Sequence, residues 1–117
     1  MAYVDGFVIP VPKANFEAYR AMAEKAAPIF KDHGALEVVE CWGDDVPMGV
    51  LTSFPRAVKC EPDEVVVFSW IVWPSRAARD AGNAKVMADP RMHHDHANTP
   101  FDGKRLIFGG FEMLLKA

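Results

Sequence analysis

The hydrophobic and polar positions of this chain follow two kinds of pattern, one typical of strands and one typical of helices. Runs of β-branched and aromatic residues predict strands over 3–9, 35–42, 64–73 and 104–114. Apolar residues recur at three- and four-residue steps over about 13–33, which predicts a helix, and Ser75 suits the N-cap of a helix over about 76–88. This order of elements predicts an α+β fold: a ferredoxin-like βαββαβ antiparallel sheet with both helices on one face.

The stretch 64–73 is unusual because both of its faces are apolar. Val65, Val67, Ile71 and Trp73 point one way, and Val66, Phe68, Trp70 and Val72 point the other. Because one layer of helices covers a single face, we expect a second copy to cover the other face and form a dimeric α/β barrel. Burying about 600 Å² at about 25 cal/mol per Å² would contribute roughly 15 kcal/mol before the cost of association.

Three smaller features refine the predicted elements. Pro28 lies inside the first helix and predicts a kink there, or a split into two helices. The second helix has a stripe of small residues that we expect to face the sheet: Ala77, Ala81, Ala84 and Ala88. The segment 43–62 is too long for a simple turn, so we expect it to fold over the sheet.

Composition narrows the class of protein. The 117 residues suit one domain, 1–117, and the net charge of −3 predicts neither nucleic-acid nor membrane binding. Two cysteines are too few for a disulfide framework, so both are expected to be reduced. No apolar run approaches a membrane span and no signal-like segment opens the chain, so we expect a cytoplasmic protein.

Several motifs resemble those of a family of small uncharacterised bacterial proteins of the YbaA type. They are 3–8 (YVDGFV), 40–42 (ECW), 67–70 (VFSW), 89–92 (DPRM) and 100–105 (PFDGKR). The resemblance implies the fold of the dimeric α/β-barrel group, which includes cofactor-free monooxygenases, haem-degrading enzymes, small isomerases and stress-response proteins. It implies no set of catalytic residues. A label carried by some members, tied to signal-recognition-particle RNA, implies RNA association.

Glu40 is the candidate catalytic residue. Its strand neighbours are apolar, and burial would raise its pKa toward a value useful for proton transfer; a salt bridge with an arginine is the alternative. Asp5 is similar, with Lys104 or Arg105 as the expected partner. Cys41 points to the opposite face from Glu40, which argues against a nucleophile and base pair, and we expect a buried, inert thiol.

Aromatic and basic residues supply the candidate ligand-binding groups. Trp42 and Trp70 could form the wall of an aromatic pocket, although core packing or a dimer interface would also explain them. Lys104, Arg105 and Arg56, joined by Arg91, could surround a carboxylate or phosphate, although a solvated turn is the ordinary interpretation.

The histidines His93, His94 and His96 are the one cluster that suggests a metal. Adjacent residues on a helical turn diverge, so a solvated turn is favoured, and neither a metal nor a cofactor is expected. The chain also has no phosphate-binding glycine loop, nucleotide fingerprint or serine elbow.

The favoured hypothesis is a small-molecule-binding dimeric barrel with a pocket between sheet, helices and the segment 43–62. Glu40, Trp42, Trp70 and Arg105 would serve proton transfer or cofactor-free oxidation of an apolar, aromatic compound, as in an isomerase-like enzyme or a cofactor-independent oxygenase. A non-catalytic binding or stress-response module is the alternative, and RNA association is a third. The residues alone leave open whether the protein is an enzyme and what it binds.

Overall fold

A computed structural model of the chain describes residues 1–92 and 99–117. It contains four strands, β1 (Tyr3–Pro12), β2 (Glu37–Trp42), β3 (Glu64–Trp73) and β4 (Ile107–Glu112). The helices are α1 (Phe16–Asp32), α2 (Phe54–Ala57) and α3 (Arg76–Ala88), with 3₁₀ turns η1 (Lys13–Asn15) and η2 (Pro90–Met92). Among the helices of these described parts, none has both the length and the apolar character needed to cross a membrane.

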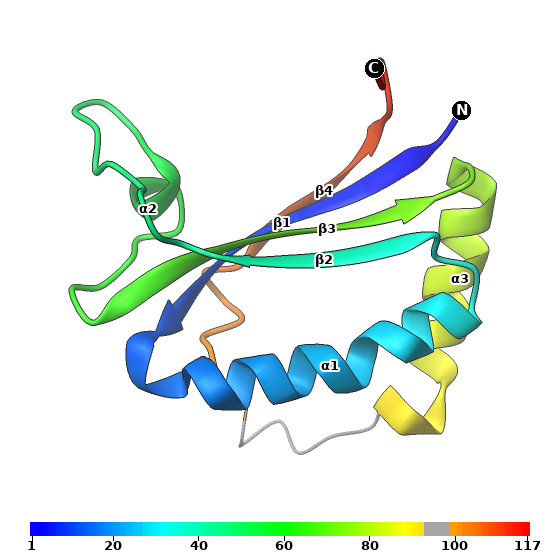
Figure 1. Cartoon of the computed structure of the whole chain (residues 1–117), viewed down its shortest axis with the longest axis horizontal. Helices are drawn as coiled ribbons and strands as arrows, with labels where there is room; N and C mark the ends of the chain where they lie inside the picture. Colours follow the sequence, from blue (N-terminus) through cyan, green and yellow to red (C-terminus); the bar gives the residue numbers. More distant parts are fainter. Residues whose placement is uncertain (93–98) are drawn as a thin grey trace.

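The four strands form one antiparallel sheet in the order β2-β3-β1-β4. Helices α1 and α3 lie on one side of this sheet, and Figure 1 shows the other side without a helical layer above the middle of the strands. The predicted α+β class with an antiparallel sheet is therefore confirmed. We call the side of the sheet opposite α1 and α3 the bare face.

Strand β3 has the two apolar faces that its sequence predicts. On the helix side, Val67, Ile71 and Trp73 are buried in two core clusters with residues of β1 and α1. On the bare face, Phe68 stays 44% exposed and Val66 is buried. The core therefore fills only one side of the sheet. On the second apolar side of β3, α2 packs against Phe68 near one end, and no other helix of the described residues lies over the strand.

Helix α1 runs without interruption through Pro28, so the alternative of two helices is wrong. Pro28 lies on the exposed side of α1, where water can satisfy the carbonyl that loses its backbone partner. Tyr19 and Ile29 point inward and are buried. Gly34 follows the helix with φ of 108°, the left-handed conformation that suits a glycine after a helix end.

Helix α3 meets the sheet through a different stripe from the one expected. The N-cap is confirmed, since the Ala78 amide donates to the Ser75 hydroxyl at 3.0 Å. The prediction that the alanine stripe faces the sheet is wrong, because Ala77, Ala81, Ala84 and Ala88 are exposed and the buried residues are Gly82 and Val86. Because α3 packs on the sheet through Gly82 and Val86, the side chains of Arg79 and Asn83 reach Asp5 of β1.

The segment 43–62 lies on the side of the sheet opposite α1, at the end where β2 finishes and β3 begins (Figure 1). It contains α2, and the ring of Phe54 packs edge-on against Phe68, with centroids 5.6 Å apart. The last strand begins at Ile107, three residues later than predicted. The residues before it form a turn in which the Lys104 amide donates to the Asp102 carboxylate at 3.0 Å.

Candidate functional site

Glu40 lies on β2 and points toward α1. The Tyr19 hydroxyl, from the inward face of α1, donates a hydrogen bond of 2.6 Å to Glu40 Oε1. Tyr19 is buried, and its ring also packs against Phe101 at 5.9 Å between centroids. The expected alternative, an arginine salt bridge to Glu40, is wrong, because the partner is a neutral hydroxyl.

The surroundings of this pair raise the pKa of both side chains. Desolvation raises the pKa of Glu40, and the hydrogen bond from Tyr19 opposes that rise. Desolvation and the nearby Glu40 carboxylate raise the pKa of Tyr19, so Tyr19 stays a donor at neutral pH. Glu40 is nevertheless an exposed residue as a whole. The pKa of its carboxylate is therefore raised on a residue that solvent reaches.

Two hollows meet at Glu40, both between α1 and the sheet. The inner hollow has a volume of about 270 Å³ and is lined by Phe7, Ile9, Tyr19, Met22, Ala23, Lys25, Ala26, Ile29, Phe30, Glu40, Ser69, Ile71, Arg91, Met92, Phe101 and Leu106. The side hollow has about 360 Å³ and is lined by Phe16, Tyr19, Arg20, Ala23, Glu24, Ala27, Val38, Glu40, Cys41, Trp42 and Val67. Tyr19, Ala23 and Glu40 belong to both hollows.

Trp42 lies beside Glu40, as the sequence suggested. Both side chains are on the helix side of β2, and the Trp42 ring packs edge-on against Phe16 with centroids 4.8 Å apart. The structure therefore brings these two predicted residues to one hollow. No residue of 43–62 lines either hollow at Glu40, so the expected contribution of that segment is wrong.

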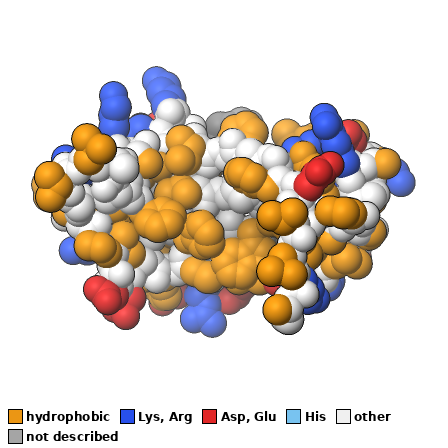
Figure 2. Space-filling view, turned by 90° about the horizontal axis from the view of Figure 1, so that it is seen from above, with side chains coloured by type: hydrophobic (Ala, Val, Ile, Leu, Met, Phe, Trp, Pro, Cys, Tyr) orange, Lys and Arg blue, Asp and Glu red, His pale blue; other side chains and the backbone are white. Residues whose placement is uncertain are grey.

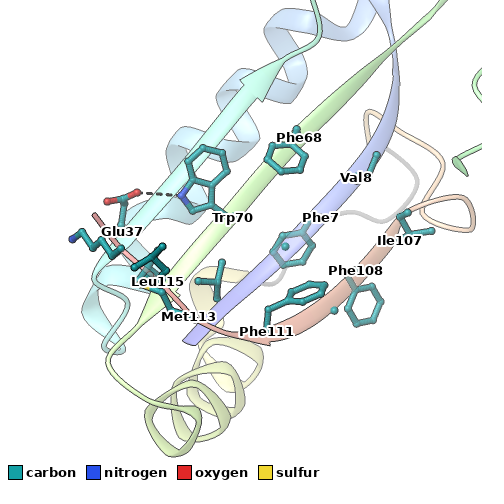
Figure 3. A pocket seen from close by; sticks show the side chains of 15 residues that line it. Phe7, Val8, Glu37, Phe68, Trp70, Ile107, Phe108, Phe111, Met113 and Leu115 are labelled. Carbon is teal, nitrogen blue, oxygen red and sulfur yellow. Dashed lines mark hydrogen bonds between the residues drawn. The ribbon is translucent and has the colours of Figure 1, made fainter. Parts of the chain in front are cut away.

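Trp70 lies on the other side of the sheet from Glu40. The register pairs Glu40 with Ser69, and the side chain of the next residue along β3 points to the bare face. There, Trp70 Nε1 donates to Glu37 Oε1 at 3.1 Å (Figure 3). The expectation that Trp70 and Glu40 share one pocket is wrong for this reason.

The bare face holds another hollow, of about 770 Å³, larger than the two at Glu40, which we call the outer hollow. It is lined by Val4, Gly6, Phe7, Val8, Glu37, Phe68, Trp70, Val72, Ile107, Phe108, Gly109, Phe111, Met113, Leu115 and Lys116. Figure 3 shows labelled side chains of β1, β3 and β4 around this hollow, with Glu37 of β2 and with Met113 and Leu115 from the segment after β4. Apart from Glu37 and Lys116, this lining is uncharged.

The basic residues do not gather around an open anion site. Arg105 donates two hydrogen bonds to the Glu64 carboxylate, at 2.6 and 2.7 Å, and one to Asp102 at 3.0 Å. The Arg56 guanidinium donates to the backbone carbonyls of Met48 and Gly49. Arg91 bonds to Asp89 and Asp32. Lys104 lies in the turn before β4, where its backbone amide donates to the Asp102 carboxylate.

Asp5 has partners other than those expected. It is 6% exposed and accepts hydrogen bonds from Arg79 at 2.9 Å, Trp73 at 3.1 Å and Asn83 at 3.3 Å. The expected pairing with Lys104 or Arg105 is therefore wrong, because α3 reaches this carboxylate from the helix side. Three donors around one buried carboxylate describe a structural anchor between β1, β3 and α3.

Two further predictions concern metals and thiols. Cys41 is exposed, so the expectation of a buried thiol is wrong; it lies on the edge strand β2. His93, His94 and His96 lie outside the described residues. Within residues 1–92 and 99–117, no group of three or more histidine, cysteine, aspartate or glutamate side chains is placed to hold a metal ion.

Comparison with known families gives a match over most of the chain. Residues 2–103 match the model of the family described as "Protein of unknown function (DUF1428)". The chain belongs to this family. Relatives of this DUF1428 protein include the "Uncharacterized protein YbaA" of Escherichia coli strain K12, Escherichia coli O157:H7 and Shigella flexneri. Each is 58% identical over 115 residues, covering 98% of both chains.

Two residues of this DUF1428 protein's hollows were missed by the sequence analysis. Tyr19 reads as one more apolar position in the helical stripe, and only the distance to Glu40 reveals its hydroxyl as a partner. Ser69 interrupts the apolar run of β3 and is the one polar residue between Val65 and Trp73. That interruption is a signal that sequence reasoning could have used.

Proposed function

We propose that this protein binds an apolar, aromatic compound in the hollows beside Glu40 and moves a proton through the Glu40 carboxylate without a cofactor. The observation that carries the proposal is the 2.6 Å hydrogen bond between Tyr19 and Glu40 at the junction of the inner and side hollows. A carboxylate with a raised pKa is a stronger base than an ordinary one. Because Glu40 is an exposed residue, exchange of its proton with water is part of the proposal.

The assembly we propose is a homodimer of single-domain, ferredoxin-like subunits that meet through their bare faces and form a dimeric α/β barrel. Several large hydrophobic side chains on or beside this face are exposed, among them Phe68, Ile107, Phe111, Leu114 and Leu115. Figure 2 shows hydrophobic side chains across the middle of the face and charged ones toward its rim. An apolar centre with a polar rim is typical of a protein interface.

The proton-transfer step can be tested with 2-tetralone, an apolar aromatic ketone with acidic α-hydrogens. Glu40 would take an α-proton, the C–H electron pair would form the C=C bond of the enolate, and the carbonyl π pair would move to oxygen. Return of a deuteron from a Glu40 carboxyl equilibrated with D₂O would label the α-carbon. We expect the wild-type protein to accelerate this labelling, as followed by proton NMR.

Matched variants separate binding from proton transfer. Glu40→Gln keeps the size of the side chain and should reduce the labelling rate by at least 100-fold. Ala23→Trp should fill both hollows and stop binding, whereas Ala21→Trp on the exposed side of α1 should not. Binding of 2-tetralone without accelerated labelling would favour the non-catalytic binding module, and an absence of binding would contradict the proposal.

A further inference from the structure

Ser69 is a buried hydroxyl in the wall of the inner hollow. It lies in the middle of β3, on the helix side, and is 3% exposed. Its neighbours in this wall are mostly apolar, including Phe7 and Ile9 of β1 and Ile71 of β3. A valine or alanine would pack in such a wall without burying a polar group, so the hydroxyl calls for an explanation.

The Ser69 hydroxyl has no hydrogen-bond partner among the described residues, whereas those of Tyr19, Ser53 and Ser75 each have one. Yet within the described chain no polar side-chain atom is both sealed from solvent and unpartnered. The Ser69 oxygen must therefore open onto the hollow that the residue lines. A buried hydroxyl that faces a cavity without a protein partner is available to a ligand.

Ser69 also lies directly across from Glu40. The two residues are register partners in the antiparallel pair of β2 and β3. Residues in such a pair point to the same face, with Cβ atoms about 4.5–5.5 Å apart. The Tyr19 hydroxyl already donates to Glu40, whereas the Ser69 hydroxyl, on the register partner of Glu40, is a donor that no described residue occupies. A ligand in the inner hollow can therefore meet an acceptor and a donor at once.

We propose that Ser69 donates a hydrogen bond to the oxygen of a bound ketone while Glu40 faces its α-carbon, so that the inner hollow selects apolar ring compounds with an enolisable carbonyl. This inference rests on the function proposed above. When Glu40 removes the α-proton, negative charge develops on the oxygen that Ser69 contacts. A donor aimed at that oxygen stabilises the enolate more than the ketone, and so raises the rate.

Two ligands that differ only in the carbonyl test this inference. Tetralin has the ring system of 2-tetralone without the oxygen, so it reports on the shape of the hollow alone. Dissociation constants for both would be measured by quenching of tryptophan fluorescence, in the wild type, in Ser69→Ala and in Thr52→Ala. The last variant removes a hydroxyl from an exposed position in the segment 43–62 and serves as the control.

We expect Ser69→Ala to raise the dissociation constant for 2-tetralone about tenfold, which corresponds to the loss of one hydrogen bond. The dissociation constant for tetralin should not change. The rate of α-deuteration should fall roughly 100-fold. Thr52→Ala should change none of these values. Unaltered binding of tetralin would also show that the hollow of the Ser69 variant is intact.

Different outcomes separate this inference from the proposed function. If Ser69→Ala leaves the affinity for 2-tetralone and the labelling rate unchanged while Glu40→Gln abolishes labelling, the role of Ser69 is wrong and the proposed function stands. Equal affinity of the wild type for 2-tetralone and tetralin would likewise overturn the inference alone. Failure of the wild type to bind either compound would overturn both.

Discussion

Two carboxylates on the helix side of the sheet, Asp5 and Glu40, have opposite surroundings. Three donors surround Asp5, and they come from β3 and α3. Glu40 has a single donor, Tyr19, and otherwise faces two hollows. A fully paired carboxylate is held in place by its neighbours, whereas a singly paired one can bind a further group. We therefore assign structure to Asp5 and chemistry to Glu40.

Asp5→Ala should destabilise the fold by about 2–4 kcal/mol, because it leaves the Trp73 indole N–H and the Asn83 amide without their acceptor and removes one of the two carboxylates that Arg79 contacts. Asp80→Ala is the matched control, since Asp80 bonds to the same Arg79 at 2.7 Å but is exposed. It should change the free energy of unfolding by no more than about 0.5 kcal/mol. Urea unfolding measures both, and equal effects would contradict the assignment.

Tyr19→Phe should raise the pKa of Glu40 further. The hydrogen bond from Tyr19 stabilises the ionised carboxylate and opposes desolvation, so its removal leaves desolvation unopposed. Tyr3→Phe, at the other tyrosine of the chain, is the control and should leave this pKa unchanged. A pH titration of the Glu40 side-chain carboxyl carbon by NMR gives this pKa in the wild type and in both variants. A fall of the pKa in Tyr19→Phe would contradict the described contact.

The elements show which features of the sequence predicted the fold and which did not. Periodicity located all four strands and both long helices, because burial of one face leaves a strong repeat. It failed for α3, where the small stripe faces solvent and the buried stripe contains Gly82 and Val86. The reason is tertiary: α3 is positioned by the ring of Trp73 beneath Gly82 and by the bonds from Arg79 and Asn83 to Asp5.

Gly82→Ala should destabilise the protein by about 1–3 kcal/mol, although glycine to alanine normally stabilises a helix. An added Cβ would lie 2.2 Å from the Trp73 ring and 2.8 Å from the His33 carbonyl oxygen, so packing decides the sign. Gly103→Ala is the control, since its Cβ would meet nothing within 4 Å. Thermal unfolding compares the two variants, and a raised melting temperature for Gly82→Ala would show that the contact is not tight.

Some contacts of the candidate site could be predicted from the sequence, and others could not. Glu40 and Trp42 share a strand face, so alternation alone predicted their proximity. Trp70 needed the register of β2 against β3, which no local pattern contains. Tyr19 needed the packing of α1 on the sheet, and the partners of Arg105 and Asp5 needed contacts between distant segments.

For the whole molecule, the main consequence of a single helical layer is that much of the apolar bare face stays exposed beyond the part that α2 covers. We expect the wild type to sediment as a dimer of about 26 kDa, twice the chain mass of 13.0 kDa. Phe111→Glu should give a monomer, because Phe111 is 60% exposed on the bare face. Met87→Glu, at a 75% exposed residue of α3, should stay dimeric. A wild-type monomer at micromolar concentration would contradict the proposed assembly.

The two sides of the sheet offer a direct test of where a ligand binds. Backbone amide shifts would be recorded by NMR on the wild-type protein during titration with 2-tetralone. We predict that the largest changes occur at Tyr19, Glu40 and Ser69, around the inner hollow. If the largest shift changes occurred instead at Phe68 and Phe111, around the outer hollow, they would contradict the account and place the ligand site on the bare face.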